Sequence, residues 1–165
     1  FQFKKDGISG IVIMNISSYI ARLKDKNSIQ IVLDLLPEWE EDIAFKKLKE
    51  KEENGYPYLD GTFPSSLARL LENKTQTKGK KTDEEKWKII KEAKKFILHF
   101  VDFYSFSNSQ VTIGGISLKE VNDYFASKQE KGLYFIGEML DMDGLCGGYN
   151  LMWAWATAYL ASIDE

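Results

Sequence analysis

The residues best placed to do chemistry stand near the C-terminal end, where a carboxylate and a glycine pair follow a short apolar run. Leu133 to Ile136 resembles a buried parallel strand that ends in Gly137 and Glu138, and a loop then leads to Gly147 and Gly148 at the start of a predicted helix. Ligands of open α/β sheets bind where strands end. A carboxylate there can accept hydrogen bonds from ribityl hydroxyls, and a helix N-terminus offers N–H groups to a flat or anionic ligand. The pattern alone favours a purely structural turn, with a flavin site as the alternative.

Other reactive groups are few. The chain has one cysteine, Cys146, and one histidine, His99, so an internal disulfide is excluded and a Cys/His metal site is disfavoured. His99 falls inside a predicted helix, where we expect a structural role. Cys146 precedes the glycine pair, where a redox role beside a flavin is the alternative to a structural one. The segment 141–144 resembles a calcium loop only faintly, because Met152 stands where an EF-hand needs a bidentate glutamate; we expect no metal.

Composition places the chain among globular proteins. Its 165 residues are 44% hydrophobic and 28% charged, enough for one ordinary domain or two small ones. The net charge of -3 gives no basic excess, so we expect no nucleic-acid partner. No apolar run is long enough to span a bilayer, so we expect no membrane partner and a cytoplasmic setting. Phe1 opens the chain inside a predicted strand, which suggests a fragment of a longer protein.

Apolar spacing and turn residues predict alternating strands and helices. Strands are expected at Phe1–Phe3, Ile29–Leu36, Val111–Ile113 and Leu133–Ile136, and helices at Ile11–Leu23, Glu38–Asn54, Phe63–Leu71, Thr82 to about Tyr104, and Asn150–Ile163. Thr82 and Glu85 form a capping-box pair, Gly7–Gly10 signals a turn, and the lysine-rich stretch Asn73–Lys81 is expected to be a mobile linker. The last helix is apolar nearly all round, so we expect it to be buried, with Trp153 and Trp155 in the core.

Four stretches resemble a known family in the same order along the chain. The string GLYFIGEMLDMDGLCGGYNLMWAWATAYLA, residues 132–161, resembles the C-terminal signature of the BaiN-like (YhiN-like) flavoproteins, which are NAD(P)/FAD-dependent oxidoreductases. Asp6–Gly10 leading into Ile16–Ser18, Phe63–Leu71 and Val111–Glu120 are similar to three further segments of that family. The middle, from about Glu38 to Glu92, matches only loosely.

The resemblance implies an α+β fold taken from a larger protein. Members have an FAD-binding Rossmann-like domain, a β-barrel-like domain and a helical domain inserted in it. This chain would carry the end of the barrel-like region in residues 1–37, the inserted helical subdomain in 38–106, a returning β segment in 107–131, and the last strand, loop and helix of the FAD domain in 132–165. The helical subdomain would thus lie between β-rich flanks.

The resemblance also implies roles for the C-terminal residues. Glu138 would bind the ribityl or nearby hydroxyls of FAD, and Asp141 and Asp143 would shape the adjacent loop. Backbone N–H groups would face the isoalloxazine from Gly147, Gly148, Tyr149, Asn150 and Leu151. NAD(P)H would be the electron donor and a small molecule the substrate, with no catalytic side chain assigned. The sequence departs from the family pattern at Ile11 (usually Pro), Cys146 (Thr), Met152 (Gln) and Ala158 (Gly), which bears on the substrate side.

One family feature is missing from the chain. No Gly-x-Gly-x-x-Gly occurs, and that fingerprint holds the pyrophosphate of FAD. We therefore expect the chain alone to bind FAD weakly or not at all. The alternative function is a non-catalytic inserted binding or assembly module, with a homo-oligomer formed through exposed apolar surface.

Overall fold

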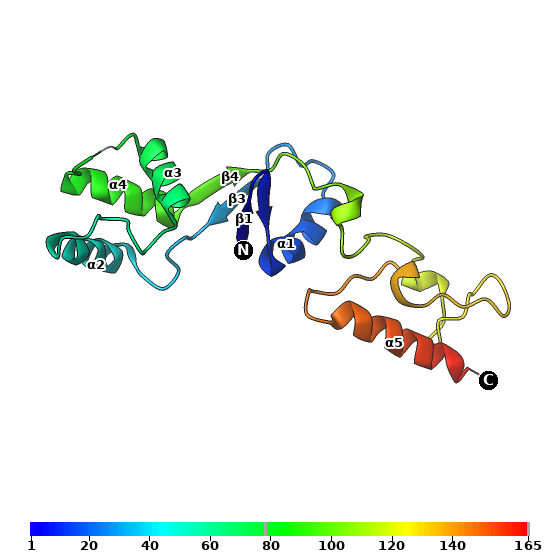
Figure 1. Ribbon diagram of the computed structural model, residues 1–165. Coiled ribbons are helices and arrows are strands. Elements are labelled where there is room, and N and C mark those ends of the chain that lie inside the picture. Colours follow the sequence, from blue (N-terminus) through cyan, green and yellow to red (C-terminus); the bar gives the residue numbers. More distant parts are fainter. Residues whose placement is uncertain (78, 165) are drawn as a thin grey trace. The chain divides into compact units, whose positions relative to one another are not determined.

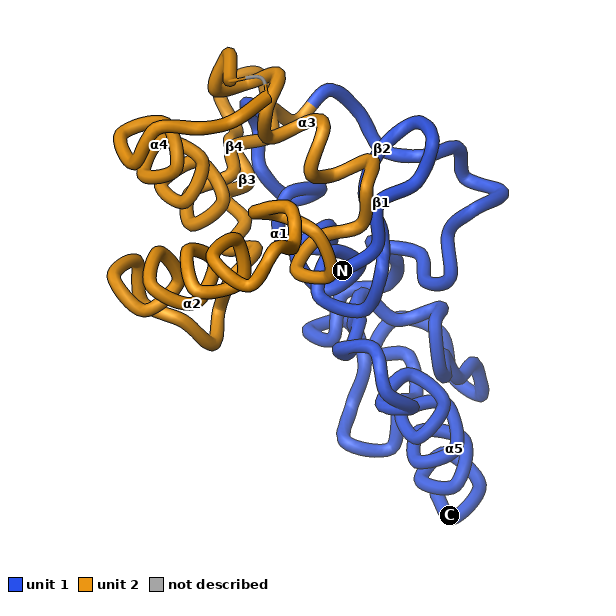
Figure 2. Tube along the Cα trace, turned by 60° about the vertical axis from the view of Figure 1, so that its left-hand side comes forward, with its two compact units in different colours: residues 1–26, 101–165 blue, residues 27–100 orange. Residues whose placement is uncertain are grey.

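The computed structural model describes residues 1–77 and 79–164, and it divides the chain into two compact units. Unit 1 combines residues 1–26 with 101–165, and unit 2 is the continuous segment Asn27–Phe100 (Figure 2). Figure 1 labels the helices and strands of both. The chain therefore leaves unit 1 after its first helix and returns to it after residue 100.

Unit 2 is built from one small sheet and three helices. Strand β3 (Gln30–Leu33) pairs antiparallel with β4 (Phe96–His99), with Leu33 opposite Phe96. Helices α2 (Glu41–Glu53), α3 (Ser65–Thr75) and α4 (Asp83–Lys94) follow one another between the two strands. They enclose a core of buried side chains: Leu33, Leu36, Ala44, Leu48, Tyr58, Leu59, Phe63, Leu71, Ile89, Ile90, Ala93 and Phe96. Because apolar residues recur at helical spacing, all three predicted helices are confirmed, with shifted ends.

The predicted helix from Thr82 to about Tyr104 is wrong beyond Lys94. Its start is confirmed, since Thr82 Oγ1 accepts from the Glu85 N–H and the Glu85 carboxylate accepts from the Thr82 N–H. After Lys94 the chain becomes β4, which satisfies the backbone groups of β3 and places the Phe96 ring in the core. His99 consequently lies exposed at the end of this strand rather than within a helix.

The predicted linker Asn73–Lys81 is also partly wrong, because α3 continues to Thr75. Gln76 then adopts a left-handed conformation, with φ of 56°, and ends the helix. The Lys81 ammonium lies 2.6 Å from the Glu72 carboxylate, which ties the stretch back to α3. Lys78 lies outside the described residues.

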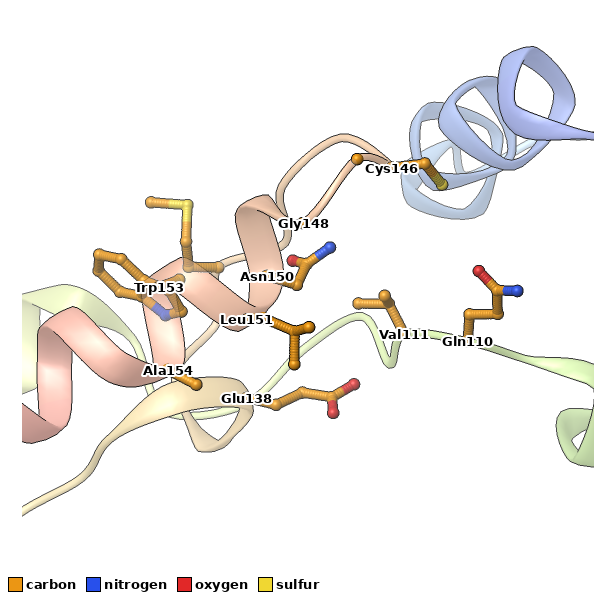
Figure 3. A pocket seen from close by; sticks show the side chains of 11 residues that line it. Gln110, Val111, Glu138, Cys146, Gly148, Asn150, Leu151, Trp153 and Ala154 are labelled. Carbon is orange, nitrogen blue, oxygen red and sulfur yellow. The ribbon is translucent and has the colours of Figure 1, made fainter.

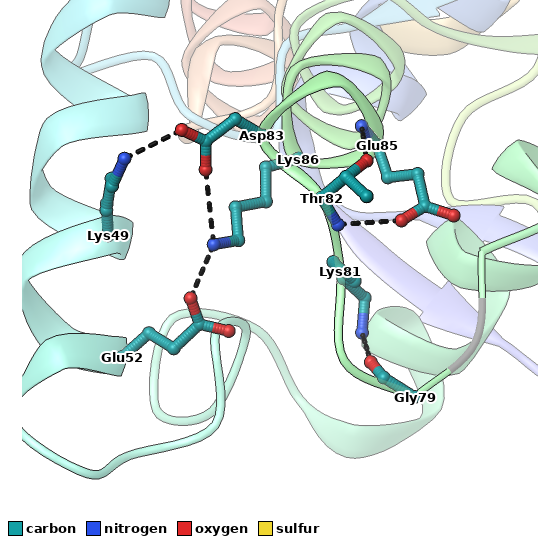
Figure 4. A network of polar contacts seen from close by, with 8 residues as sticks. All are labelled: Lys49, Glu52, Gly79, Lys81, Thr82, Asp83, Glu85 and Lys86. Carbon is teal, nitrogen blue, oxygen red and sulfur yellow. Dashed lines mark hydrogen bonds and ion pairs between the residues drawn. The ribbon is translucent and has the colours of Figure 1, made fainter.

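A charged network joins α2 and α4 (Figure 4). The Lys86 ammonium is buried and lies 2.5 Å from the Glu52 carboxylate and 3.5 Å from that of Asp83, which also pairs with Lys49 at 2.7 Å. The hydrogen bond to Glu52 raises the pKa of Lys86, and the hydrogen bond from Lys49 lowers the pKa of Asp83. The Tyr58 hydroxyl nearby is buried and has no hydrogen-bond partner among the described residues, and its pKa is raised by burial first and then by the charges of Glu52 and Asp83.

Unit 1 begins with a hairpin and a helix. Strand β1 (Gln2–Lys4) pairs antiparallel with β2 (Gly7–Ser9), so the predicted turn at Gly7–Gly10 is wrong and the chain turns at residues 5–6 instead. Helix α1 (Ile11–Arg22) then begins one residue after Gly10, whose φ of 102° suits glycine. This confirms the predicted helix at Ile11–Leu23.

The returning part of unit 1 is mostly loop. It contains three 3-10 turns, η1 (Phe106–Asn108), η2 (Leu118–Glu120) and η3 (Gly137–Met139), followed by helix α5 (Tyr149–Ser162). The predicted strands Val111–Ile113 and Leu133–Ile136 are wrong: among the described residues the first forms no β pairing, and the second forms only an isolated bridge between Tyr134 and Ala126. A three- or four-residue apolar segment becomes a strand only where a neighbouring strand pairs with it.

Helix α5 is confirmed, but its predicted burial is wrong. Thr157 is its one fully buried residue, whereas Trp155 is 79% exposed and Trp153 is half-buried. Within unit 1 the helix packs chiefly on η3, which covers one side of it. The α+β class is confirmed; the insertion of a helical subdomain, the domain boundaries at 37, 106 and 131, and the origin of the flanks stay predictions. No helix among residues 1–77 and 79–164 is long and apolar enough to cross a membrane.

Candidate functional site

A cavity of about 310 Å³ opens in unit 1 between η3, the start of α5 and the returning loop (Figure 3). Eleven residues line it: Gln110, Val111, Glu138, Met142, Cys146, Gly147, Gly148, Asn150, Leu151, Trp153 and Ala154. The lining combines one carboxylate with apolar side chains and glycine backbone. Its volume lies at the small end of the range of about 300–1,000 Å³ for ligand pockets.

Glu138 is positioned by the packing of its neighbour Gly137 on α5. Gly137 is buried with φ of 60°, its N–H donates to Thr157 Oγ1 at 2.9 Å, and its carbonyl accepts from Trp153 Nε1 at 3.1 Å. A Cβ at this glycine would lie 3.4 Å from the Ala154 Cβ, which is an ordinary contact, so it is the φ of 60° that favours glycine here. The Glu138 carboxylate accepts a hydrogen bond from the Thr112 N–H at the cavity edge. These contacts hold an exposed carboxylate beside the start of α5.

The first turn of α5 presents backbone to the cavity. Gly148 is the N-cap residue, with φ of 93°, and it supplies no side-chain hydrogen bond to the helix. The first helical bond is donated by the Met152 N–H to the Gly148 carbonyl at 3.0 Å. A Cβ built on Gly148 would meet no other atom within 4 Å. The helix start therefore leaves N–H groups without intrahelical acceptors, next to open space that a ligand can enter.

The loop between η3 and α5 is held from two directions. Asn150 closes it locally, since its side chain accepts from the Gly144 N–H at 2.7 Å and donates to the Gly144 carbonyl at 3.0 Å. Asp143 forms an ion pair with Arg22 of α1, whose hydrogen bond lowers the pKa of Asp143. The Cys146 N–H donates to Asn15 Oδ1 of α1 at 2.8 Å.

Comparison with known proteins decides the family. The profile of the HI0933-like protein Rossmann domain matches residues 10–164, which is nearly the whole chain. The chain belongs to this family. The resemblance to BaiN-like flavoproteins seen in the sequence is thereby confirmed.

Characterised relatives carry two kinds of name. The chain is 39% identical over 168 residues to the 3-dehydro-bile acid delta(4,6)-reductase of Clostridium scindens, covering 94% of this chain and 41% of that protein. It is 33% and 27% identical over 173 residues to the ribosomal RNA dihydrouridine synthases of Haemophilus influenzae and Escherichia coli, covering 98% of this chain and 41% of each. The chain thus spans about two fifths of the length of these relatives.

The structure brings together five of the eight site residues that the family resemblance implied. Glu138, Gly147, Gly148, Asn150 and Leu151 line the cavity. Three predicted residues do not line it: Asp141, Asp143 and Tyr149. Asp143 contacts α1 instead, and Tyr149 is 61% exposed. The binding roles assigned to all eight stay predictions.

Six lining residues were not assigned to the site from sequence: Gln110, Val111, Met142, Cys146, Trp153 and Ala154. The place of Cys146 directly before the glycine pair is a usable signal in the sequence. Trp153 and Ala154 lie three and four residues after Asn150, about one helical turn, and helix periodicity could have found them. Gln110 and Val111 reach the cavity only because the returning loop passes η3, for which the sequence holds no local signal.

The lining fits part of a flavin. Glu138 is an acceptor for hydroxyls, the first turn of α5 offers N–H groups, and Val111, Met142 and Leu151 supply apolar contact for a flat ring. A cavity of this size holds only a part of a dinucleotide. No group of three or more His, Cys, Asp or Glu side chains in the described residues is arranged to hold a metal ion.

Proposed function

We propose that this chain supplies one wall of the FAD site of a flavin-dependent reductase. The observation that carries the proposal is the convergence of Glu138 and the glycine-started helix α5 on one cavity, in a chain of the HI0933-like family. When bound, FAD supplies hydride or electron transfer. The chain contributes position and electrostatics to that chemistry.

The residues of the cavity have separate tasks in this proposal. Glu138 accepts hydrogen bonds from ribityl or nearby hydroxyls, and the Thr112 N–H keeps its carboxylate oriented. The N–H groups at residues 147–151 would hold the isoalloxazine, where the positive end of the α5 dipole would favour negative charge. Asp141 and Asp143 shape the loop from outside the cavity.

The reaction we propose is reduction of a carbon–carbon double bond in a ring. One relative is named a 3-dehydro-bile acid delta(4,6)-reductase, and two are named ribosomal RNA dihydrouridine synthases. Both kinds of name indicate the addition of hydrogen to a substrate, which is chemistry that a flavin performs. NAD(P)H as the electron donor belongs to the same proposal. A cytoplasmic location belongs to it as well, since a chain with a single cysteine needs no oxidising compartment.

A small molecule is the substrate class that we propose. With 22 basic and 25 acidic residues, the chain has no excess of positive charge with which to hold an RNA backbone. The names of two relatives favour ribosomal RNA as the second candidate. Salt-dependent retention of a ribosomal RNA fragment by the purified chain would favour RNA, and its absence would favour the small molecule.

The flavin proposal is tested with a hybrid protein. In the bile-acid reductase of Clostridium scindens, the part that aligns with this chain is replaced by this chain. We expect the hybrid to bind FAD and show flavin absorption, and Glu138→Ala to weaken FAD binding about 10- to 100-fold, the effect of losing one hydrogen bond to a charged group. The matched control is Glu130→Ala, an exposed glutamate outside the cavity. A folded hybrid without flavin, or equal affinity in the two variants, would contradict the proposal.

The chain on its own should bind FAD weakly or not at all, because it lacks the glycine fingerprint for the pyrophosphate. A titration followed by flavin fluorescence measures this directly. Tight stoichiometric binding would show that the cavity alone suffices and that the one-wall description is wrong.

A non-catalytic assembly role is the other candidate function, and the exposed face of α5 favours it. Leu151, Met152, Trp155 and Tyr159 are between 66% and 79% exposed and follow one another at helical spacing. If this stripe drives self-association, the chain has the mass of an oligomer in solution and Trp155→Lys converts it to a monomer. A monomeric wild-type chain excludes this role.

A further inference from the structure

Helix α1 carries a polar face within a largely apolar sequence. Asn15, Ser18 and Arg22 are separated by three and four residues, so they lie on one side of the helix over two turns. Most of the other residues of α1 are apolar, and Ser17 bonds within the helix to the Met14 carbonyl. The stripe formed by Asn15, Ser18 and Arg22 is therefore free to contact another segment.

This stripe contacts the loop that leads into α5. Arg22 forms an ion pair with the Asp143 carboxylate, which is only 9% exposed, and the Ser18 hydroxyl beside this pair also helps to lower the pKa of Asp143. The guanidinium is oriented by its hydrogen bonds to the Ser18 carbonyl and hydroxyl, both at 3.1 Å. Three residues further along the loop, the Cys146 N–H donates to Asn15 Oδ1 at 2.8 Å. Two points of one loop are thus fixed to one rigid helix.

The same loop lines the cavity. Met142 directly precedes the attachment at Asp143, and Cys146 is itself the second attachment point; both contribute to the lining, and Gly147 and Gly148 follow directly. The orientation of the N–H groups at the start of α5 depends on where this loop leaves them, since glycines with positive φ have many alternative conformations. A fixed anchor just before the glycine pair removes that freedom.

We propose that the Asn15–Ser18–Arg22 face of α1 is the positioning element of the cavity, holding residues 143–146 so that Gly147 and Gly148 present their backbone to the ligand. That the ligand is a flavin rests on the proposed function. The attachment of the loop does not, because its contacts lie within the described chain. Arg22 and Asn15 are positioning residues, since neither lines the cavity itself.

Cys146 provides the test, because it is the only cysteine in the chain and lies on the attached loop, partly buried. Its alkylation rate in the complete 165-residue chain, without flavin, reports local opening of the loop. We expect Arg22→Ala to raise the rate about two- to fivefold, the range for loss of an ion pair near the surface, and Asn15→Ala to raise it about fivefold through loss of a hydrogen bond.

Three variants distinguish a positioning role of the Asn15–Ser18–Arg22 face from a general destabilisation of the chain. Asn15→Asp keeps an oxygen acceptor, and the exchange Arg22→Asp with Asp143→Arg restores opposite charges; both should return the rate toward that of the wild type. Arg69→Ala, an exposed arginine of unit 2, is the matched control and should leave the rate unchanged. If Arg22→Ala lowers the overall helical content, the charge exchange still decides, because its recovery requires the pair itself.

The proposal is overturned if Arg22→Ala and Asn15→Ala alkylate at the rate of Arg69→Ala, or if the charge exchange fails to slow the reaction in a chain that stays folded. In the hybrid protein, Arg22→Ala should also weaken FAD binding and shift the flavin absorption band. A hybrid that binds no flavin refutes the proposed function while leaving the alkylation result intact, so the two failures are distinguishable.

Discussion

Replacing Thr157 by valine tests how η3 is held against α5. Thr157 is fully buried, and its Oγ1 accepts from the Gly137 N–H at 2.9 Å while donating to the Trp153 carbonyl at 2.8 Å. Valine has nearly the same shape but offers no acceptor. The Gly137 N–H is then buried without a partner, which costs about 1–3 kcal/mol, whereas the Trp153 carbonyl keeps its acceptor role within the helix. We therefore expect Thr157→Val to destabilise unit 1 by about 2 kcal/mol.

Amide hydrogen exchange resolved by NMR is the assay for this variant, because it measures unit 1 separately from unit 2. Protection of the Gly137 amide and of the α5 amides should fall in Thr157→Val. Thr157→Ser is the matched control: it keeps the hydroxyl, loses one methyl group worth about 1 kcal/mol, and should retain the protection of Gly137. If Thr157→Val protects Gly137 as well as the wild type does, or destabilises no more than Thr157→Ser, the reasoning is refuted.

Three further predictions concern single groups. Tyr58→Phe should raise the free energy of unfolding of unit 2 by about 1 kcal/mol in urea, because it removes a buried hydroxyl without a partner; lower stability would contradict this. Thr82→Ala should lower the free energy of unfolding of unit 2 by about 1 kcal/mol through loss of the helix cap, while Thr82→Ser should leave it unchanged. Because Arg22 holds the pKa of Asp143 below its usual range, Asp143 contributes stability above about pH 4 that disappears as the pH falls through its folded-state pKa. The stability difference between wild type and Asp143→Asn should therefore vanish in acid, and a difference that persists there would count against the ion pair.

Local signals in the sequence were sufficient where the structure is decided over a few residues. The capping box of Thr82 and Glu85 fixes the start of α4, because both hydrogen bonds close within one turn. The glycine pair before α5 marks that helix start for the same reason, since Gly148 adopts a φ that other residues avoid. The family was also readable, because its C-terminal signature is continuous in the chain.

Sequence patterns gave wrong predictions where the same residues fit more than one kind of secondary structure or environment. Phe96–His99 continues the apolar pattern of α4, yet it forms β4 because β3, more than 60 residues earlier, needs a pairing partner. Leu133–Ile136 has the composition of a buried strand but finds no strand beside it in the described residues. Helix α5 has no polar face, so its pattern predicted burial, while the described residues cover only its η3 side.

The sequence by itself determined the family, the starts of α1, α4 and α5, and the carboxylate and glycines that line the cavity, because each depends on residues close together in the chain. Only the tertiary structure decided that Asp143 pairs with Arg22, 121 residues away, instead of lining the cavity, and that Asn15 Oδ1 accepts a hydrogen bond from the Cys146 N–H. Sequence spacing carries no information about such a contact, since which side chains meet depends on how the returning loop packs against α1. The physical reason is that ion pairs and buried hydrogen bonds select partners by distance in space, which the folded chain alone defines.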